Sequence, residues 1–347
     1  MKAAVFSRPG DSLSIEQVDD PTAGPNELIL RVGACGICGS DLHISDVHDE
    51  TGGMRPLRPG TIMGHEFCGE VVEVGSAVRG AWTSGQRVTA LPYIGCGRCG
   101  PCLTGRGHRC QSDTHTGIGM GGLPGGYAEY VKVGAHESLL LPAGVSDAEG
   151  AMVEPLAVGL HAVNKAGPIA GARVLVIGAG PVGLSVATWC RVFGARDVVV
   201  SDLVASRAKR AADFGATDFI VASQQDVVGS FKQSAGRRPD LIFDAVGVAG
   251  SQQLAINYAP TDGRIVVVGV CMHPDQTVPV KAITKELSVT YVYMYERSDF
   301  ELTIDMIERG RVDVASMVTD VVGFDEFAAA FDALKTPDEQ CKVLLKP

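Results

Sequence analysis

Three glycines between an apolar run and a helical segment constrain this chain more than any other feature. The run RVLVIG (173–178) has the length and β-branched content of a buried strand, and GAGPVG (178–183) follows it directly. In this G-x-G-x-x-G pattern Gly178 permits a tight turn, Gly180 allows the backbone to approach a pyrophosphate, and Gly183 lets the helix pack on the strand. The helix start also offers unpaired N–H groups to phosphate. By itself, the pattern equally fits an ordinary glycine-rich strand-to-helix turn.

Asp202 supplies the context that the glycine pattern needs. It ends the next apolar run, DVVVSD (197–202), where an acidic side chain can bind the ribose hydroxyls of a dinucleotide. A 2′-phosphate in that place would meet a like charge, so the sequence predicts NAD rather than NADP. Arg207, five residues further on, has the charge to neutralise such a phosphate, but we expect the acid to decide.

Five apolar runs of strand length recur between residues 173 and 269, and helix-compatible stretches separate most of them. Runs without polar alternation are typical of a parallel sheet that is covered on both faces. A further run at 287–295 is expected to close the sheet. Residues 156–293 are therefore predicted to form an α/β Rossmann domain with a doubly wound parallel sheet of six strands. The five runs lie at 173–178, 197–202, 218–221, 240–247 and 264–269, and the helical stretches include 181–195 and 204–216.

The first 155 residues follow a different pattern, in which short strands are broken by turns. Gly and Pro stand at nearly every junction, which favours an irregular β domain. The last segment, 294–347, contains amphipathic helical stretches and is expected to return to this first domain, since it follows the final strand. The strand-like segments of the first domain lie at 28–36, 70–75, 86–91 and 125–133.

Composition excludes several classes of protein. A length of 347 residues indicates two domains at about 150 residues each, and 46% hydrophobic residues exclude intrinsic disorder. The net charge of −10 leaves no basic footprint for nucleic acid. No run approaches the roughly 18 apolar residues of a membrane span, and the N-terminus lacks an apolar signal core. We therefore expect a cytoplasmic protein with neither nucleic acid nor membrane as a partner.

Four of the ten cysteines lie close together in a Gly- and Pro-rich loop (95–111). Cys96, Cys99, Cys102 and Cys110 have the spacing C-x2-C-x2-C-x7-C. Four thiolates can close a tetrahedral zinc site that leaves no position for a substrate. An iron–sulfur cluster is the nearest rival, but its usual pattern has a shorter last gap and a following proline, where Gln111 stands here. Four unligated surface thiols would be reactive. The loop therefore predicts a structural zinc site.

A second group of possible metal ligands cannot be identified from spacing alone. Cys38 and His65 lie 27 residues apart, a lone His is more often structural, and the Cys35–Cys38 pair also fits a redox motif. However, Gly64-His65-Glu66-x2-Gly69-x5-Gly75-x2-Val78 resembles the signature of zinc-containing medium-chain alcohol dehydrogenases. That family also carries a CGICGSDLH-like segment (35–43), the four-cysteine loop and the Rossmann motif in this order. The resemblance covers essentially the whole chain and implies a GroES-like catalytic domain in front of the Rossmann domain.

The resemblance implies roles for individual residues. The ligands of a catalytic zinc would be Cys38, His65 and Glu154, and Asp41 would orient a ligand from behind. Ser40 would contact the alcohol, His43 would be the outer end of a proton relay, and Glu66 would lie beside the zinc and exchange into its coordination sphere. Val158 and Val182 resemble residues that press the nicotinamide ring against the substrate, and Arg207 resembles a ribose contact. Further cofactor contacts are expected at Pro181, Val246, Val268 and Val270.

Glu154 departs from the ethanol-type pattern, which has a cysteine at this position. The surrounding VEPLAVG (153–159) resembles instead the sorbitol, butanediol and polyol branch. Cys38 and Glu154 would still give the ion two anionic ligands, although Glu66 competes for the place of Glu154. A helix-terminal acid is the plain structural alternative for Glu154.

The expected activity is a reversible, zinc-dependent hydride transfer between NAD and a secondary alcohol, diol or polyol, with two zinc ions per chain. The alternatives are a threonine dehydrogenase or another zinc alcohol dehydrogenase that acts on primary or aryl alcohols. A catalytically silent, crystallin-like NAD binder is the alternative outside the enzymes. Related enzymes form dimers or tetramers, so a homo-oligomer is expected.

Overall fold

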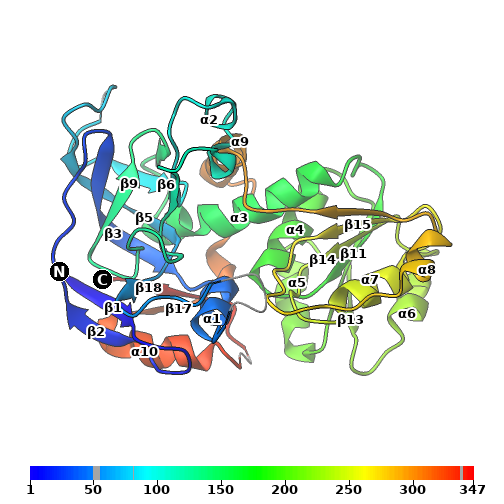
Figure 1. Cartoon of the computed structure of the whole chain (residues 1–347). Coiled ribbons are helices and arrows are strands. Elements are labelled where there is room, and N and C mark those ends of the chain that lie inside the picture. The colour runs from blue at the N-terminus through cyan, green and yellow to red at the C-terminus, as the bar shows by residue number, and fades with distance from the viewer. Residues whose placement is uncertain (50–54, 81, 337–338) are drawn as a thin grey trace. The chain divides into compact units, whose positions relative to one another are not determined.

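The computed structural model describes residues 1–49, 55–80, 82–336 and 339–347. Contacts divide these residues into two units (Figure 1). The first consists of residues 1–49, 55–154 and 295–347, so it contains both ends of the chain, and the second is the continuous stretch 155–294.

The second unit is built on a parallel sheet of six strands in the order β13-β12-β11-β14-β15-β16, which confirms the predicted Rossmann architecture. β11 lies in the middle of the sheet, and the order of the strands reverses beside it. Ligands of such sheets bind at this switch point, outside the carboxyl ends of the strands. The strands are β11 (Arg173–Ile177), β12 (Asp197–Asp202), β13 (Asp218–Val221), β14 (Leu241–Asp244), β15 (Arg264–Val267) and β16 (Ser288–Tyr291).

Helices cover both faces of this sheet because its strands are apolar on both sides. Leu175 of β11 belongs to a buried cluster that includes Phe231 of α6 and Ile256 of α7. Val176, the next residue, points to the opposite face and lies under the start of α4, where Gly183 leaves room for it. The helices are α4 (Pro181–Val192), α5 (Ala208–Asp213), α6 (Val227–Ala235), α7 (Ser251–Tyr258) and α8 (Pro279–Ile283), with a 3-10 turn η2 (Ala205–Arg207).

Two predicted strands end earlier than the apolar pattern suggested. The run 240–247 is extended only to Asp244, and the run 264–269 only to Val267. Beyond these points the two loops approach each other closely: a Cβ added to Gly269 would lie 2.3 Å from the nitrogen of Gly247. The apolar residues after the strands therefore belong to two packed loops at the carboxyl edge of the sheet. The run 287–295 likewise forms a strand only over 288–291.

The first unit contains a mixed sheet in the order β10-β6-β5-β3-β18-β17, with β9 also pairing with β3, and a smaller sheet in the order β2-β1-β4. β7 and β8 form a separate antiparallel pair. The strands are β1 (Lys2–Phe6), β2 (Ser14–Gln17), β3 (Glu27–Gly36), β4 (Thr61–Ile62), β5 (Glu66–Val74), β6 (Arg87–Ala90), β7 (Tyr93–Ile94), β8 (Thr116–Gly117), β9 (Tyr130–Gly134), β10 (Ser138–Leu140), β17 (Val318–Val322) and β18 (Lys342–Leu345).

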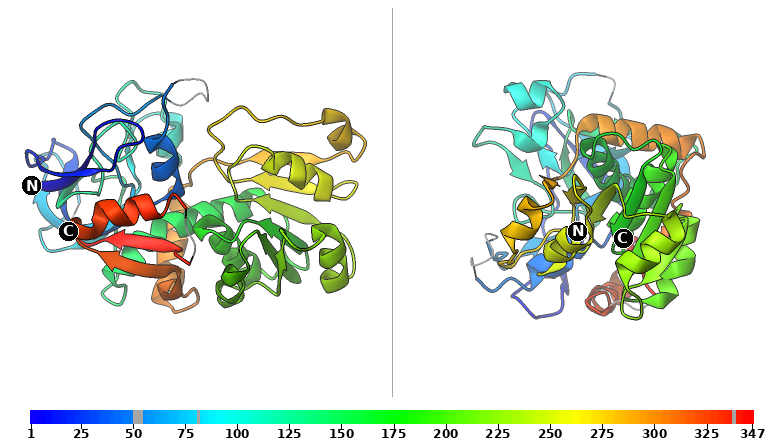
Figure 2. Two further views of the ribbon diagram at one scale, coloured as in Figure 1. Left: turned by 90° about the horizontal axis from the view of Figure 1, so that it is seen from below. Right: turned by 90° about the vertical axis from the view of Figure 1, so that its right-hand side faces the viewer.

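The C-terminal segment completes this sheet, as predicted. β18 pairs antiparallel with β3, and Leu344 stands opposite Gly36. α10 (Phe324–Ala333) packs against β17 and β18, and Figure 2 shows the helix and the two strands together, coloured orange to red. The last residues of the chain are thus brought next to the end of β3, directly before Cys38.

The remaining helices of the structure are short except for two. α3 (Asp147–Lys165) carries Pro155 within it, and α9 (Arg297–Glu308) begins two residues after the chain re-enters the first unit. Among the described residues, no helix has the length and apolarity that crossing a bilayer requires. The others are α1 (Gly39–Ser45), α2 (Gly100–Leu103), and the 3-10 turns η1 (Gly107–Arg109) and η3 (Ala315–Met317).

Candidate catalytic site and metal-binding groups

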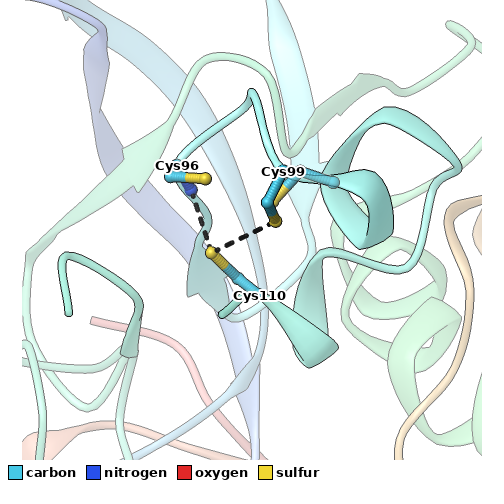
Figure 3. Close-up of side chains that lie close together, drawn as sticks. Cys96, Cys99 and Cys110 are labelled. Carbon is cyan, nitrogen blue, oxygen red and sulfur yellow. Dashed lines mark hydrogen bonds between the residues drawn. The ribbon is translucent and has the colours of Figure 1, made fainter. Parts of the chain in front are cut away.

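The four-cysteine loop, here called the cysteine lobe (residues 95–111), brings its thiols together. The sulfur atoms of Cys96, Cys99, Cys102 and Cys110 all lie within 4.8 Å of one another. Cys99 caps the short helix α2, Cys102 lies within it, and Cys110 follows η1. Figure 3 shows Cys96, Cys99 and Cys110 turned toward a common centre, with the Cys96 N–H donating to the Cys110 sulfur over 3.4 Å.

The chemistry of these thiols fits a metal-bound state. Backbone N–H groups of Arg98 and Cys99 lower the pKa of Cys96 to about 6, and those of Cys102 and Gln111 lower the pKa of Cys99. Burial and the neighbouring thiols raise the pKa of Cys102 to about 12. Four soft sulfur donors within reach of a common centre are the ligand set of a closed structural zinc site.

Contacts outside the loop hold the cysteine lobe in place. The Gly95 N–H donates to the buried Glu137 carboxylate at 3.1 Å. The N–H of Arg297, the first residue of α9, donates to the carbonyl of Gly105 at 3.1 Å. The Arg297 guanidinium donates to the carbonyls of His136 at 2.5 Å and Ser138 at 3.3 Å. The lobe is thus fastened both to the turn before β10 and to the C-terminal segment.

A second group of possible ligands, Cys38, His65 and Glu66, lies at the ends of β3 and β5. Their ligand atoms are all within 4.8 Å of one another. The register of the two antiparallel strands explains the meeting, because Gly36 stands opposite Glu66. Gly64 has a φ of +95°, and a Cβ there would lie 2.5 Å from the Tyr127 ring. The residues that the chain separates by 27 positions are therefore joined by strand pairing.

Asp41 fixes the orientation of His65 from behind. Its Oδ1 atom lies 3.1 Å from His65 Nδ1, while its Oδ2 atom accepts hydrogen bonds from the Tyr127 hydroxyl at 2.5 Å and the Cys38 N–H at 3.0 Å. Burial alone would lower the pKa of His65, but the charge of Asp41 and the contact with Cys38 hold it well above its usual value. A carboxylate on one imidazole nitrogen leaves the other nitrogen, Nε2, directed at the ligand group.

Glu66 is paired with a lysine that the sequence analysis did not identify. Lys342 Nζ lies 2.7 Å from both carboxylate oxygens and also donates to the carbonyl of Ile37 at 2.8 Å. Both side chains are 1% exposed. Burial tends to lower the pKa of Lys342, but the charges of Glu66 and Cys38 raise it above its usual value. The only local signal was a lysine as the first residue of an otherwise apolar strand, KVLL (342–345).

Glu154 lies on α3 and is buried in the same electrostatic neighbourhood. Burial and the Glu66 charge raise its pKa to about 7, opposed by His65, by the Tyr295 hydroxyl and by Lys342. Its oxygens are not among the ligand atoms that lie within 4.8 Å of one another. In this structure Glu66, rather than Glu154, is therefore the carboxylate that joins Cys38 and His65 in the ligand group, and Glu154 stands beside that group.

Ser40 and His43 both lie on α1, after Cys38. The Ser40 hydroxyl is 3.4 Å from His65 Nε2, so it borders the ligand group. His43 is exposed, one turn further along the helix. The structure thus places a hydroxyl at the site and an imidazole toward water.

The glycine motif forms the expected strand–turn–helix. Gly178 has a φ of +100°, and a Cβ on Gly183 would lie 2.0 Å from the Gly178 carbonyl oxygen. Gly180 precedes Pro181 at the start of α4, and a Cβ there would meet no atom within 4 Å. Open space therefore lies beside the backbone at the helix start, where a pyrophosphate would need to approach.

Asp202 holds the same loop from β12. Its Oδ2 atom accepts the N–H of Ala179 at 2.8 Å and a guanidinium N–H of Arg207 at 3.0 Å, and its Oδ1 atom accepts the N–H of Val204 at 2.9 Å. The carboxylate therefore carries compensating contacts on both oxygens while it ends a strand at the carboxyl edge of the sheet.

The predicted valine contacts fall into different surroundings. Val246 lies 3.2 Å from the position of a Cβ on Gly178, whereas Val268 is buried and Val270 is largely exposed. Val158 and Val182 are half-buried on α3 and α4. Asp244, which the sequence analysis did not select, ends β14 and accepts hydrogen bonds from the Ser251 hydroxyl and the Val246 N–H, so it shapes the loop that carries Val246.

Comparisons with known proteins agree with this architecture. Residues 24–143 match the alcohol dehydrogenase GroES-like domain, and residues 181–309 match the zinc-binding dehydrogenase family. An L-threonine 3-dehydrogenase of Rhizobium rhizogenes is 31% identical over 341 residues, which are 97% of this chain and 96% of that protein.

Solved structures extend the likeness to the fold. A putative zinc-binding dehydrogenase of Sinorhizobium meliloti, bound to NADP, superposes with a TM-score of 0.87 at 32% identity over 100% of this chain and 99% of that one. An Escherichia coli protein described as a short chain alcohol dehydrogenase, RspB, complexed with NADH, has a TM-score of 0.88 at 30% identity over the same shares. With both domains matched and the metal-ligand groups assembled, this chain belongs to the zinc-containing medium-chain alcohol dehydrogenase family.

Proposed function

We propose that this protein is an NAD-dependent alcohol dehydrogenase that reversibly oxidises a secondary alcohol, including diols and polyols, to a ketone. The observation that carries the proposal is the buried group of Cys38, His65 and Glu66, with Asp41 behind the histidine and Glu154 beside it. A thiolate, an imidazole and a carboxylate are a ligand set that zinc accepts in catalytic sites.

Cys38, His65 and Glu154 would hold the catalytic zinc, and the four thiols of the cysteine lobe would hold a second, structural one. A bound zinc supplies a Lewis acid that lowers the pKa of an alcohol hydroxyl. Asp41 keeps the His65 ring oriented and Lys342 neutralises Glu66, so the anionic ligands left for the ion would be Cys38 and Glu154. The choice of Glu154 over Glu66 as third ligand rests on this neutralisation.

The proton of the alcohol leaves by way of α1. Ser40 borders the ligand group through its 3.4 Å contact with His65, so its Oγ atom would accept the proton of the alcohol while its own hydroxyl proton passes on toward His43. His43 is exposed on the same helix and returns the proton to water. Imidazole is suited to this last step because its ordinary pKa lies close to neutrality.

Asp202 supports NAD as the cofactor. A 2′-phosphate would place about two negative charges against a carboxylate that already ends β12, and like charges in contact are unfavourable. Arg207 is bound to that carboxylate at 3.0 Å and is thereby less available to a phosphate.

Substrate choice separates two candidates. The similarity of VEPLAVG (153–159) to the polyol branch favours a diol or polyol, while the 31% identity to an L-threonine 3-dehydrogenase favours a 2-amino-3-hydroxy acid. The reacting hydroxyl is secondary in both. One experiment tests the proposal: kcat/KM of the zinc-loaded enzyme with NAD on 2,3-butanediol, sorbitol, L-threonine, 1-phenylethanol and ethanol.

We expect the secondary alcohols to exceed ethanol by at least about tenfold in kcat/KM, which corresponds to about 1.4 kcal/mol. Preference for ethanol would overturn the secondary-alcohol assignment. NAD binding without turnover of any substrate in the panel would favour the silent dinucleotide binder instead.

Association through β16 is the proposed basis of a homo-oligomer. β16 is an edge strand of the six-stranded sheet, and Tyr291 and Tyr293 at its end are about two-thirds exposed. Open edges of this kind pair readily with a second strand. Light scattering of the parent and of a Val289→Pro variant, which blocks ladder hydrogen bonds, would test it.

Ten free cysteines also suit a reducing cytoplasm, where we expect the protein.

A further inference from the structure

Tyr295 is a fully buried side chain with a polar end that the structure leaves unused. It is the first residue of the chain's return to the first unit and is 1% exposed. Its ring packs against Phe300 of α9, with 4.7 Å between the ring centres. Its hydroxyl makes no hydrogen bond of good geometry to any residue that the structure describes. A buried hydroxyl without a partner is unfavourable, so its position needs a reason.

The group beside the Tyr295 hydroxyl is the carboxylate of Glu154. The Tyr295 and Glu154 side chains are in contact. Glu154 is itself buried, with 6% of its surface exposed. A phenol donates one hydrogen bond, and a carboxylate offers two oxygens, of which a metal ligand uses one. Tyr295 is thus placed to hold the oxygen that a metal ion would leave free.

Other neighbours of Glu154 do not fill this role. Lys342 is close enough to act on Glu154, but its ammonium group donates to both oxygens of Glu66 and to the Ile37 carbonyl. His65 is held by Asp41 through one nitrogen and directed at the ligand group through the other. Of these three neighbours, Tyr295 is therefore the donor that is not engaged by another group.

The position of Tyr295 is itself fixed from the cysteine lobe. Two residues later, the N–H of Arg297 donates to Gly105 in the lobe, and the Arg297 side chain donates to His136 and Ser138 beside it. The segment 295–297 is thus fastened at one end to the lobe, while its other end lies against Glu154.

We propose that Tyr295 is a positioning residue that orients the Glu154 carboxylate for the catalytic metal, and that Arg297 couples this position to the cysteine lobe. The inference rests on the proposed role of Glu154 as a ligand. It assigns to the lobe, through Gly105 and Arg297, an effect on the catalytic site in addition to its effect on stability.

The test is the release of zinc from the holoenzyme to a chromogenic chelator, which reports both sites without using turnover. Cys38→Ser and Cys102→Ser identify which phase of release belongs to which site. Tyr295→Phe keeps the ring against Phe300 and removes only the hydroxyl. Tyr293→Phe, two residues away and 66% exposed, is the matched control.

We expect Tyr295→Phe to weaken zinc binding at the catalytic site by about 10- to 100-fold, the range seen when a residue that orients a ligand is removed. Binding at the cysteine lobe should stay at the parental level. Arg297→Ala should weaken the catalytic site in the same direction but less. Tyr293→Phe should change neither phase.

A double-mutant cycle separates this inference from the function on which it rests. In a Glu154→Gln background, Tyr295→Phe should have no further effect on catalytic-site zinc, because the two residues act as one unit. Additive losses would mean that Tyr295 acts only on packing and would overturn the inference. Unchanged zinc binding in Glu154→Gln alone would overturn the ligand assignment instead.

Discussion

The cysteine lobe and the buried Cys38–His65–Glu66 group are assembled in opposite ways. The lobe takes its four sulfur atoms from residues 96–110, and only Cys102 among them is buried. The second group takes its atoms from the ends of two strands, and it is completed by Asp41 behind it and by Lys342 from the last strand of the chain. The lobe is a single loop that needs a bound cation to hold its sulfur atoms together. The buried group is brought together by the pairing of strands.

This difference determines what each site does when it is disturbed. The lobe has few buried contacts of its own, so the free energy of metal binding is largely its folding free energy. The buried group is held by strand register and by compensated charges, so its geometry exists without the ion. Removing a ligand should therefore damage stability at the lobe and turnover at the buried group.

The largest expected effect is on the lobe. Cys102→Ser should lower the zinc content from two to one per chain and destabilise the protein by more than about 5 kcal/mol, since structural zinc contributes on the order of 10 kcal/mol in small zinc domains. Elemental analysis and thermal unfolding measure both. Cys271→Ser, at a half-exposed thiol of the second unit, is the control and should keep both zinc ions. Unchanged zinc in Cys102→Ser would contradict the structural-site assignment.

The opposite pattern is expected at the buried group. Cys38→Ser should leave thermal unfolding and NAD binding near the parental values, while kcat falls about a thousandfold or more, because several kcal/mol of Lewis-acid stabilisation are lost. Steady-state kinetics and NAD titration measure the two sides of this split. Near-parental turnover would point to Cys35 as the ligand instead.

The sequence predicted the cysteine lobe more completely than the buried group. The reason is how far apart along the chain the residues of each site lie. The lobe and the glycine motif are local, so the cysteine spacing suggested the zinc, and the glycine pattern together with Asp202 suggested the dinucleotide. Cys38 and His65 became candidates only through resemblance, because the strand register that joins them is not visible in their spacing. Lys342 was missed because its partner lies 276 residues away and meets it only when β18 pairs with β3.

The strand ends at the carboxyl edge show a similar limit. Apolar character continues through Val246 and Val268, so the pattern predicted longer strands than the structure contains. What ends them is the packing of two loops around Gly247 and Gly269, a contact between segments about twenty residues apart. Periodicity reports burial, and loops that pack on each other are buried too.

Lys342 tests whether the buried group depends on the pairing of its charges. Lys342→Met should destabilise the protein by about 3–5 kcal/mol, because it leaves Glu66 charged and buried without a partner. Lys335→Met is the control: its pairs with Asp46 and Asp332 are partly exposed, and such pairs contribute about 0–1 kcal/mol. Denaturant unfolding measures both.

A second substitution distinguishes the ion pair from simple packing. Glu66→Gln combined with Lys342→Met removes both charges and should recover much of the lost stability. If the double variant were as unstable as the sum of the two single variants, the charge of Glu66 would not be the cause of the loss.

The smallest effect is expected at Asp202. Like the lobe, this residue could be selected from the sequence. Like the buried group, it acts through a charge that has a partner. Its carboxylate holds Ala179 and Arg207 and, in the proposed function, the ribose hydroxyls. Asp202→Ser removes the charge that a 2′-phosphate would meet and frees Arg207 to pair with that phosphate. The preference for NAD over NADP, measured as the ratio of the two kcat/KM values, should fall by about 10- to 100-fold, which corresponds to one or two charged hydrogen bonds of about 1.5 kcal/mol each. Asp218→Ser, at the opposite end of the neighbouring strand β13, should leave the ratio unchanged. A parent enzyme that used NADP as well as NAD would show that Arg207 already overcomes the carboxylate, and the assignment of Asp202 as the selecting residue would then be wrong.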